Sequence, residues 1–146
     1  MTSDLREVLR FDHVGVSVGN LEQSHCFYAD VLGFSEIEDT FELPAHGVRG
    51  MVLLNRSGTR IELFEHKDSR ILRGGDPIAD IALRGWFQLA LAVSDIHAVY
   101  AHAVATGARA VKAPFVAPDN RTVVAFVADM DNNLIELVQR AAAVHS

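Results

Sequence analysis

The chain has 146 residues, of which 49% are hydrophobic and 22% are charged, and its formal net charge at pH 7 is −6. This length suits one domain with a substantial core, and the negative charge argues against nucleic acid or an anionic membrane surface as a partner. No apolar run approaches the length of a bilayer span and no N-terminal stretch reads as a leader, so we expect a cytoplasmic protein that contacts no membrane. The single cysteine, Cys26, excludes an internal disulfide.

The first half of the chain predicts one strand, one helix and three further strands. The β-rich run FDHVGVSV stops at Gly19 and Asn20, and Asn20 is a typical helix cap. The next segment, LEQSHCFYADVL, carries apolar residues at helical spacing and ends before Gly33. The alternating or apolar runs that follow predict strands at residues 35–43, 48–57 and 59–66.

The second half repeats this pattern. WFQLALAV predicts a strand, Ser94-Asp95 a cap, and IHAVYAHAVAT a helix that stops at Gly107. Three more strands are predicted at residues 110–117, 121–129 and 133–140. We therefore predict an α+β protein made of two tandem βαβββ modules, residues 11–66 and 86–140, joined by a connection over residues 67–85 within a single domain, 1–146.

The spacing of caps, stops and polar residues supports a duplication. Asn20 and Asp95 lie 75 residues apart, and the centres of the two Ile-Glu-Leu triplets, Glu62 and Glu136, lie 74 apart. A repeat that preserves helix caps and strand positions together is stronger evidence than a repeated tripeptide.

Four polar side chains recur at equivalent places inside otherwise apolar strands: His13, Glu62, Gln88 and Glu136. A buried ionised carboxylate costs several kcal/mol unless it is paired, protonated or bound to a cation. One imidazole, two carboxylates and an amide oxygen that converge from equivalent strands predict a divalent metal site.

Several motifs resemble the vicinal oxygen chelate superfamily, which includes glyoxalases, bleomycin-resistance proteins and extradiol dioxygenases. The resemblance lies in FDHVGVSV, LEQSHCFY, VLGF and the closing VVAFVADMDNNLIEL, and it covers nearly the whole chain. It implies a curved sheet around a metal-binding cavity, metal ligands at His13, Glu62, Gln88 and Glu136, and a homodimer. This ligand set is similar to that of glyoxalase I, with Gln and His exchanged. The DMDNN turn departs from the usual Asp-Pro-Asp-Gly, which alters a turn and not the site.

The resemblance implies an enzyme of the glyoxalase I type that uses Zn, Ni, Co, Mn or Fe and a small-molecule substrate. A metal with open positions holds the substrate through adjacent oxygens and stabilises the enediolate formed by proton removal. A carboxylate must move the proton, and we assign this role to Glu136, with Glu62 as the symmetry-related alternative. The reaction class is lyase, isomerase or epimerase.

Three other functions are alternatives to this one. An extradiol dioxygenase would use two His and one carboxylate for Fe(II), and Gln88 stands where its second His belongs. An enzyme like methylmalonyl-CoA epimerase would share His13 and Glu136 but commonly has Gln and His at the places of Glu62 and Gln88. A non-catalytic, drug-sequestering protein of the bleomycin-resistance type needs only an aromatic-lined cavity, and it has no reason to retain four ligand-type residues.

The same comparison predicts that a glutathione conjugate is not the substrate. In glyoxalases an Arg follows the first-strand ligand by four residues and an Asn follows the first Glu by four, and both reach glutathione. Here these places hold Ser17 and His66. Arg49, Arg60 and Arg121 are candidates to meet an anionic substrate, but solvated charge at strand edges explains each of them more simply.

Overall fold

The computed structural model describes residue 6 and residues 9–142, and it confirms the two tandem βαβββ modules. The first module consists of β1 (His13–Val18), α1 (Leu21–Leu32), β2 (Glu36–Leu43), the 3-10 helix η2 (Pro44–His46), β3 (Val48–Leu54) and β4 (Arg60–His66). The second consists of β5 (Gln88–Ala92), α2 (Ile96–Ala105), β6 (Arg109–Val116), β7 (Val123–Ala128) and β8 (Leu134–Gln139). The connection contains one short 3-10 helix, η3 (Asp80–Ala82).

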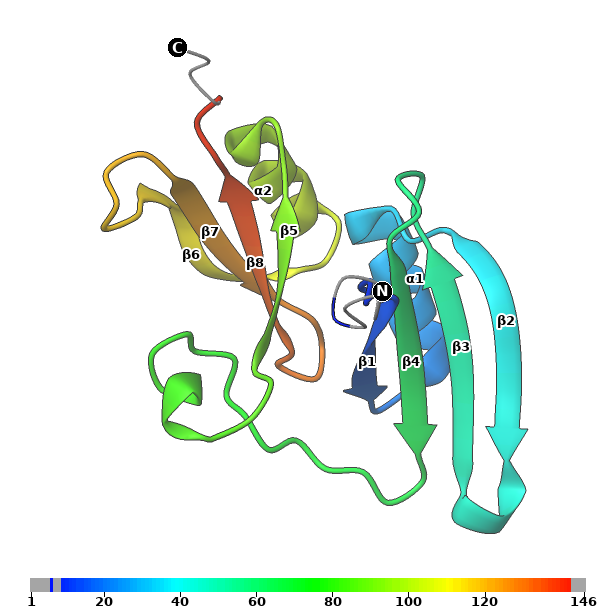
Figure 1. Cartoon of the computed structure of the whole chain (residues 1–146). Coiled ribbons are helices and arrows are strands. Elements are labelled where there is room, and N and C mark those ends of the chain that lie inside the picture. The colour runs from blue at the N-terminus through cyan, green and yellow to red at the C-terminus, as the bar shows by residue number, and fades with distance from the viewer. Residues whose placement is uncertain (1–5, 7–8, 143–146) are drawn as a thin grey trace.

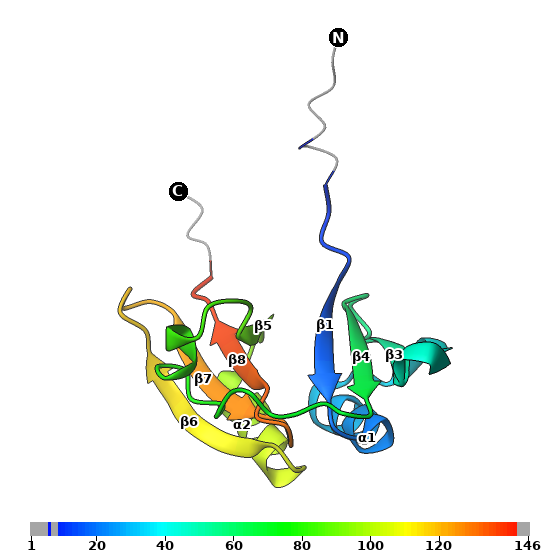
Figure 2. The same cartoon turned by 90° about the horizontal axis from the view of Figure 1, so that it is seen from below.

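Each module forms its own four-stranded sheet, and the two sheets have the same topology. The strand orders are β1-β4-β3-β2 and β5-β8-β7-β6. In each sheet the first strand pairs in parallel with the last, and the other neighbours are antiparallel. Figure 1 shows the sheets side by side with β1 and β4 nearest to β5 and β8, and in Figure 2 the green connection runs between the modules from β4 toward β5.

The helix boundaries follow from the residues predicted to set them. The Asn20 side chain accepts a hydrogen bond from the Gln23 amide at 2.8 Å, and the Asp95 side chain accepts one from Ala98 at 3.1 Å. Gly33 ends α1 in the left-handed conformation, with φ of 78°, which a residue with a side chain adopts at a steric cost. The helix of each module thus begins at its predicted N-cap, and α1 ends at its predicted glycine.

Side chains along the last strand of each module, β4 and β8, alternate between the core and the opposite face of the sheet. Ile61 and Leu63 of β4 are fully buried in the core that contains α1 and α2 residues, and Ile135 and Leu137 of β8 belong to the same cluster. Because successive strand side chains point to opposite faces, Glu62 and Glu136 lie on the face away from the helices. The repeated carboxylates therefore share one side of the molecule.

The modules contact each other through α1, α2 and the turn between β7 and β8. The Tyr28 hydroxyl of α1 donates to Asp129 Oδ2 at 2.8 Å, and both residues are buried. The Asn133 side chain donates to the Ser17 carbonyl at 3.1 Å and to Asp129 Oδ2 at 2.8 Å. Burial raises the pKa of the Asp129 carboxyl, while its hydrogen bonds to Asn133 and Tyr28 oppose that rise. The DMDNN turn thus joins the two halves.

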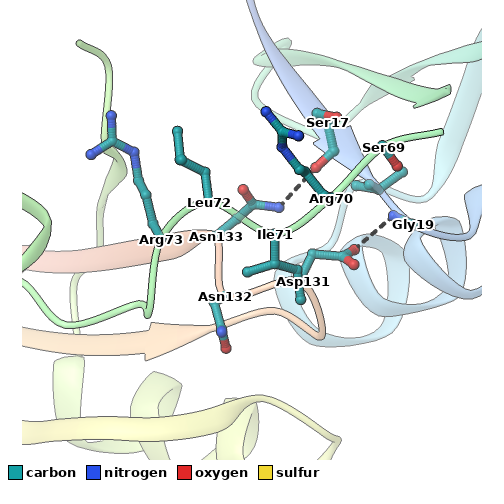
Figure 3. A pocket seen from close by; sticks show the side chains of 11 residues that line it. Ser17, Gly19, Ser69, Arg70, Ile71, Leu72, Arg73, Asp131, Asn132 and Asn133 are labelled. Carbon is teal, nitrogen blue, oxygen red and sulfur yellow. Dashed lines mark hydrogen bonds between the residues drawn. The ribbon is translucent and has the colours of Figure 1, made fainter. Parts of the chain in front are cut away.

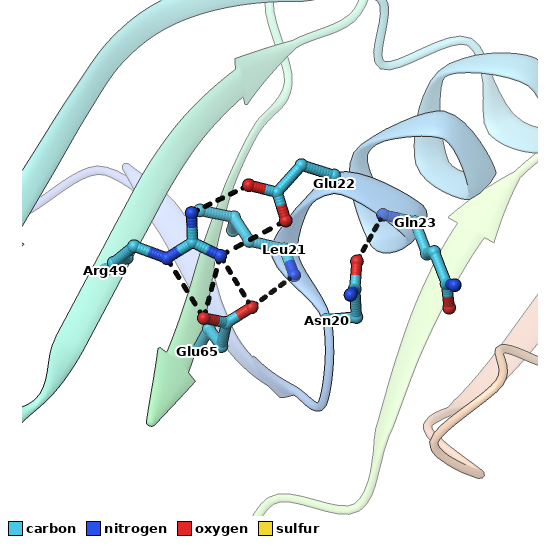
Figure 4. A network of polar contacts seen from close by, with 6 residues as sticks. All are labelled: Asn20, Leu21, Glu22, Gln23, Arg49 and Glu65. Carbon is cyan, nitrogen blue, oxygen red and sulfur yellow. Dashed lines mark hydrogen bonds and ion pairs between the residues drawn. The ribbon is translucent and has the colours of Figure 1, made fainter. Parts of the chain in front are cut away.

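Arg49 is not the solvated charge that the sequence suggested. It lies between two carboxylates, donating to Glu22 at 2.7 Å and to Glu65 at 2.8 Å (Figure 4). Glu65 Oε2 also accepts a hydrogen bond from the Leu21 amide at 2.7 Å, at the first residue of α1. This network ties the start of α1 to β3 and β4.

No helix in the described part of the chain is both long enough and apolar enough to cross a membrane.

Candidate functional site

The first pair of predicted ligands meets on the sheet of the first module. His13 begins β1 and Glu62 lies in β4, whose residues pair in parallel with β1. His13 Nε2 lies 2.8 Å from Glu62 Oε2, and the two side chains are 39% and 19% exposed. The structure therefore brings an imidazole nitrogen and a carboxylate together at one accessible point.

Asp12 holds the other side of the His13 ring. Its Oδ2 lies 2.6 Å from His13 Nδ1, and its Oδ1 lies 3.6 Å from Arg60, which in turn binds Glu38. The Asp12 hydrogen bond, followed by the charge of Glu62, raises the pKa of His13. A carboxylate on Nδ1 fixes the ring orientation and leaves Nε2 for a ligand, as is common around metal-binding histidines. Asp12 is not among the residues predicted from the sequence, although it directly precedes His13.

The second pair forms in the same way on the other sheet. Gln88 begins β5, and its Nε2 donates to Glu136 Oε2 in β8 at 2.5 Å. The Gln88 oxygen, not its nitrogen, would face a metal, and a rotation of the amide exchanges the two. The pair thus repeats the His13–Glu62 contact with an amide in place of the imidazole.

Apolar side chains flank Glu136 on its own face of β8. Its strand neighbours on the same face, Leu134 and Val138, pack with Val124 and Phe126 in a second apolar cluster. Burial raises the pKa of Glu136, while the hydrogen bond from Gln88 opposes the rise. A carboxylate with a raised pKa is a stronger base once it has lost its proton, which suits the role predicted for it.

The two pairs do not meet in the structure. Within residue 6 and residues 9–142, no three His, Cys, Asp or Glu side chains are grouped as a metal site requires. The free edges of β1 and β5 face each other across a cavity of about 220 Å³, lined by residues of both strands, Gln88 among them. The donor set of one imidazole, two carboxylates and one amide fits a divalent ion in chemical type, and each half of that set is already in contact.

The structure also shows where Ser17 and His66, which the sequence comparison singled out, and the aromatic Trp86 lie. Trp86 lines this cavity and is 99% exposed, so it does not fill the core. His66 is exposed, and its Nδ1 accepts a hydrogen bond from the Asp68 amide at 3.0 Å. Ser17 is exposed and lines the same cavity as Trp86.

Comparison with known proteins agrees with this architecture. The profile of the Glyoxalase/Bleomycin resistance protein/Dioxygenase superfamily matches residues 10–137. Mouse (Mus musculus) mitochondrial methylmalonyl-CoA epimerase is 43% identical over 55 residues, which are 38% of this chain and 30% of that enzyme. The matched stretch thus spans under a third of that relative's length.

Solved structures show the same fold. Glyoxalase I from Zea mays superposes with a TM-score of 0.72 at 21% identity, covering 92% of this chain and 46% of that one. A glyoxalase family protein from Enterococcus faecalis superposes with a TM-score of 0.74 at 21% identity, covering 90% of this chain and 98% of that one. From its sequence profile and its paired βαβββ modules, the chain belongs to the glyoxalase/bleomycin resistance protein/dioxygenase superfamily.

Proposed function

We propose that this protein is a divalent-metal-dependent enzyme that moves a proton next to a carbonyl group. The observation that supports it is the pair of matching contacts, His13 with Glu62 and Gln88 with Glu136, at equivalent positions of two equivalent sheets. A structural role alone does not explain why both halves keep a ligand-type pair on the same face. The reaction class is isomerisation, epimerisation or a glyoxalase-type lyase step.

Each residue has a defined part in this proposal. His13, Glu62, Gln88 and Glu136 would hold a divalent ion, and Asp12 would keep the His13 ring in place. Such an ion would supply positive charge next to the substrate carbonyl, which would acidify the neighbouring C–H group. Glu136 would move the proton, because apolar side chains flank it on its own face of β8 and a carboxylate is a suitable base for this step. Glu62 is the alternative base.

The similarity to methylmalonyl-CoA epimerase makes acyl thioesters the first substrate class to test. In a thioester bearing a second carbonyl group, the hydrogen on the carbon between the two is acidic. Its removal from one face and protonation on the opposite face invert the centre, and the two carboxylates of the proposed site, Glu136 and Glu62, are the groups that would serve the two faces.

We also propose that the protein is a homodimer. Several large apolar side chains of the connection, and that of the residue that follows it, are exposed, and burial of such side chains favours association. They are Ile71, Leu72, Ile78, Ile81 and Trp86. A partner module, or a closer approach of the two modules of one chain, would unite the half-sites. Light scattering after size exclusion gives the mass, and a single-chain mass at tens of micromolar contradicts the dimer.

A second candidate function is small-molecule binding without catalysis. A cavity of about 690 Å³ lies between β5, α2 and the loop of residues 55–59, and aliphatic side chains such as Leu91, Val93 and Val99 line it. Its size is within the usual range for small-molecule pockets. A binding protein of this kind needs no metal, which separates the two functions.

Two measurements on protein purified without an affinity tag or added metal test the proposal. Elemental analysis should find about one divalent ion per chain, and less in the double variant His13→Ala with Glu62→Ala. Mass spectrometry should then detect deuterium from solvent in methylmalonyl-CoA or another carbonyl substrate. Stoichiometric metal in the double variant would overturn the ligand assignment. An absence of both metal and exchange would favour the binding protein.

A further inference from the structure

A small cavity lies at the end of β1 that is farther from His13. It has a volume of about 190 Å³, several times the roughly 30 Å³ that one water occupies. Three segments form its wall: residues 17–19, residues 69–73 of the connection, and residues 131–133 of the turn before β8. Figure 3 shows Arg70 and Arg73 extending in the same general direction from the connection, with Leu72 between them. The cavity thus combines two guanidinium groups with polar groups from both modules.

Neither arginine is neutralised by a carboxylate. Arg70 makes no hydrogen bond or ion pair with any residue that the structure describes. Arg73 donates through Nη1 to the backbone oxygens of Asp80 and Leu83, at 2.9 and 3.1 Å, which leaves Nε and Nη2 without a partner among the described residues. By contrast, Arg49 and Arg60 are held by carboxylates and have little capacity for another anion.

The rest of the wall favours a negative group. Its one carboxylate, Asp131, accepts a hydrogen bond from the Gly19 amide at 3.0 Å and pairs with neither arginine. The Ser17 hydroxyl makes no hydrogen bond to a described residue, so its proton is available to a ligand. The wall therefore carries two guanidinium groups and one carboxylate, that of Asp131, so its net charge is positive. Guanidinium groups bind carboxylates and phosphates through paired donors.

This cavity shares part of its wall with the cavity between β1 and β5, which is lined by one of the four proposed metal ligands, Gln88. Ser17, Arg73 and Asn133 also line the cavity between β1 and β5 that contains Gln88. Ser17 follows His13 by four strand residues, which corresponds to about 13 Å along β1. An anionic group bound here would therefore belong to an elongated substrate whose carbonyl lies at the other end.

We infer that Arg70, Arg73 and Ser17 form a subsite for a carboxylate or phosphate group of the substrate. The inference rests on the proposed function in one respect only, namely that the bound anion is part of the substrate. Anion binding itself involves none of the four proposed metal ligands. The subsite also explains how a chain with Ser17 in place of an arginine can still recognise a charged substrate, since the connection supplies the charge instead.

The test uses chelator-treated protein labelled with ¹⁵N, freed of chelator and titrated at constant ionic strength. Sodium phosphate and sodium malonate are the probes, and sodium chloride is the reference. The amide signals of Ser17, Gly19, Arg70 and Arg73 should shift saturably with at least one probe and not with chloride. Saturation by phosphate alone would identify the bound group of the substrate as a phosphoryl group, and saturation by malonate alone would identify it as a carboxylate. Saturation by both probes would show that the subsite accepts either anion.

Arg70→Ala should weaken this binding about tenfold, because one charge-assisted fork is lost. The matched control is Arg56→Ala, which removes an exposed arginine at the opposite end of β4 and should change the dissociation constant less than twofold. Arg73→Lys keeps the positive charge but loses the paired donors of the guanidinium group. Its dissociation constant should fall between those of Arg70→Ala and Arg56→Ala. Absent saturation, or equal binding in Arg70→Ala and the unsubstituted protein, overturns the subsite. Failure of the metal test leaves these outcomes unchanged, so the two proposals fail independently.

Discussion

At the scale of single residues, Glu136 combines the two properties that the proposed reaction needs. It lies on a partly apolar face, where burial raises its pKa, and it contacts the proposed ligand Gln88 directly. Glu62 lies in the equivalent place but beside the imidazole of His13. This difference in surroundings is the reason to assign the base to Glu136.

Replacing Glu136 with Gln should separate metal binding from proton transfer. The amide keeps the size and one oxygen ligand but cannot accept the substrate proton, so turnover should fall by roughly two orders of magnitude or more. Metal content, measured on the same preparation, should remain near that of the unsubstituted protein. Undiminished deuterium exchange in Glu136→Gln would move the role of base to Glu62.

Asp12 supports His13 from outside the ligand set, and Asp12→Asn should therefore weaken metal binding. The contact is accessible to solvent, so we expect the lower end of the usual effect of such partners, roughly tenfold in affinity. Competition with a chromophoric chelator measures the dissociation constant. Asp68→Asn, which removes an exposed carboxylate outside this contact, is the control and should have no effect. Equal affinities for the two variants would show that Asp12 does not position the ring.

At the scale of secondary structure, Glu65 links three elements of the first module. It accepts the Leu21 amide at the start of α1 and pairs with Arg49 of β3, while lying in β4 itself (Figure 4). Side-chain periodicity does not reveal such a network, because its members come from segments far apart in the sequence.

Glu65→Ala should lower the free energy of unfolding by about 2 kcal/mol, since it removes hydrogen bonds to a charged partner and to a helix end. Urea unfolding followed by circular dichroism gives the change. Glu36→Ala, at an exposed position of β2, should stay within about 0.5 kcal/mol of the unsubstituted protein. A similar small change for Glu65→Ala would mean that solvent screens the network.

Strand β6 has an irregular pairing that the local sequence pattern does not predict. β6 contains Pro114, which cannot donate to a neighbouring strand, and its pairing with β7 shifts register between Lys112 and Phe115. β6 lies at the edge of its sheet, where a proline is tolerated. The strand was predictable from its β-rich residues, but its irregular register was not.

At the scale of the whole molecule, the arrangement of positive charge bears on the substrate. Ser17 and His66 stand at the two places where the sequence resemblance predicts glutathione-binding residues in a glyoxalase, and neither offers a guanidinium. Arg70 and Arg73, which pair with no carboxylate among the described residues, lie instead in the connection between the modules. A substrate recognised here should differ from a glutathione conjugate in the position of its charge.

We therefore predict poor turnover of the glutathione hemithioacetal of methylglyoxal. A hydroxyl cannot replace a bidentate guanidinium for a carboxylate, so the conjugate loses binding energy even with the metal chemistry intact. Steady-state assays with Zn, Ni, Co and Mn in turn measure kcat/KM. A value near 10⁵ M⁻¹s⁻¹ or above, as for an ordinary good enzyme, would show this prediction to be wrong.

The sequence by itself determined the order and type of the elements, the caps at Asn20 and Asp95, and the two pairs of candidate ligands. These features depend on backbone periodicity and on hydrogen bonds within a few residues, which the duplicated spacing made visible. The tertiary structure decided what lies between the modules. It brought Ser17 and Asn133 to the same cavity as Arg70, paired Arg49 with Glu65, and left His13–Glu62 and Gln88–Glu136 as separate pairs. Such contacts depend on how two packed sheets approach each other across the connection, and no local pattern encodes that distance.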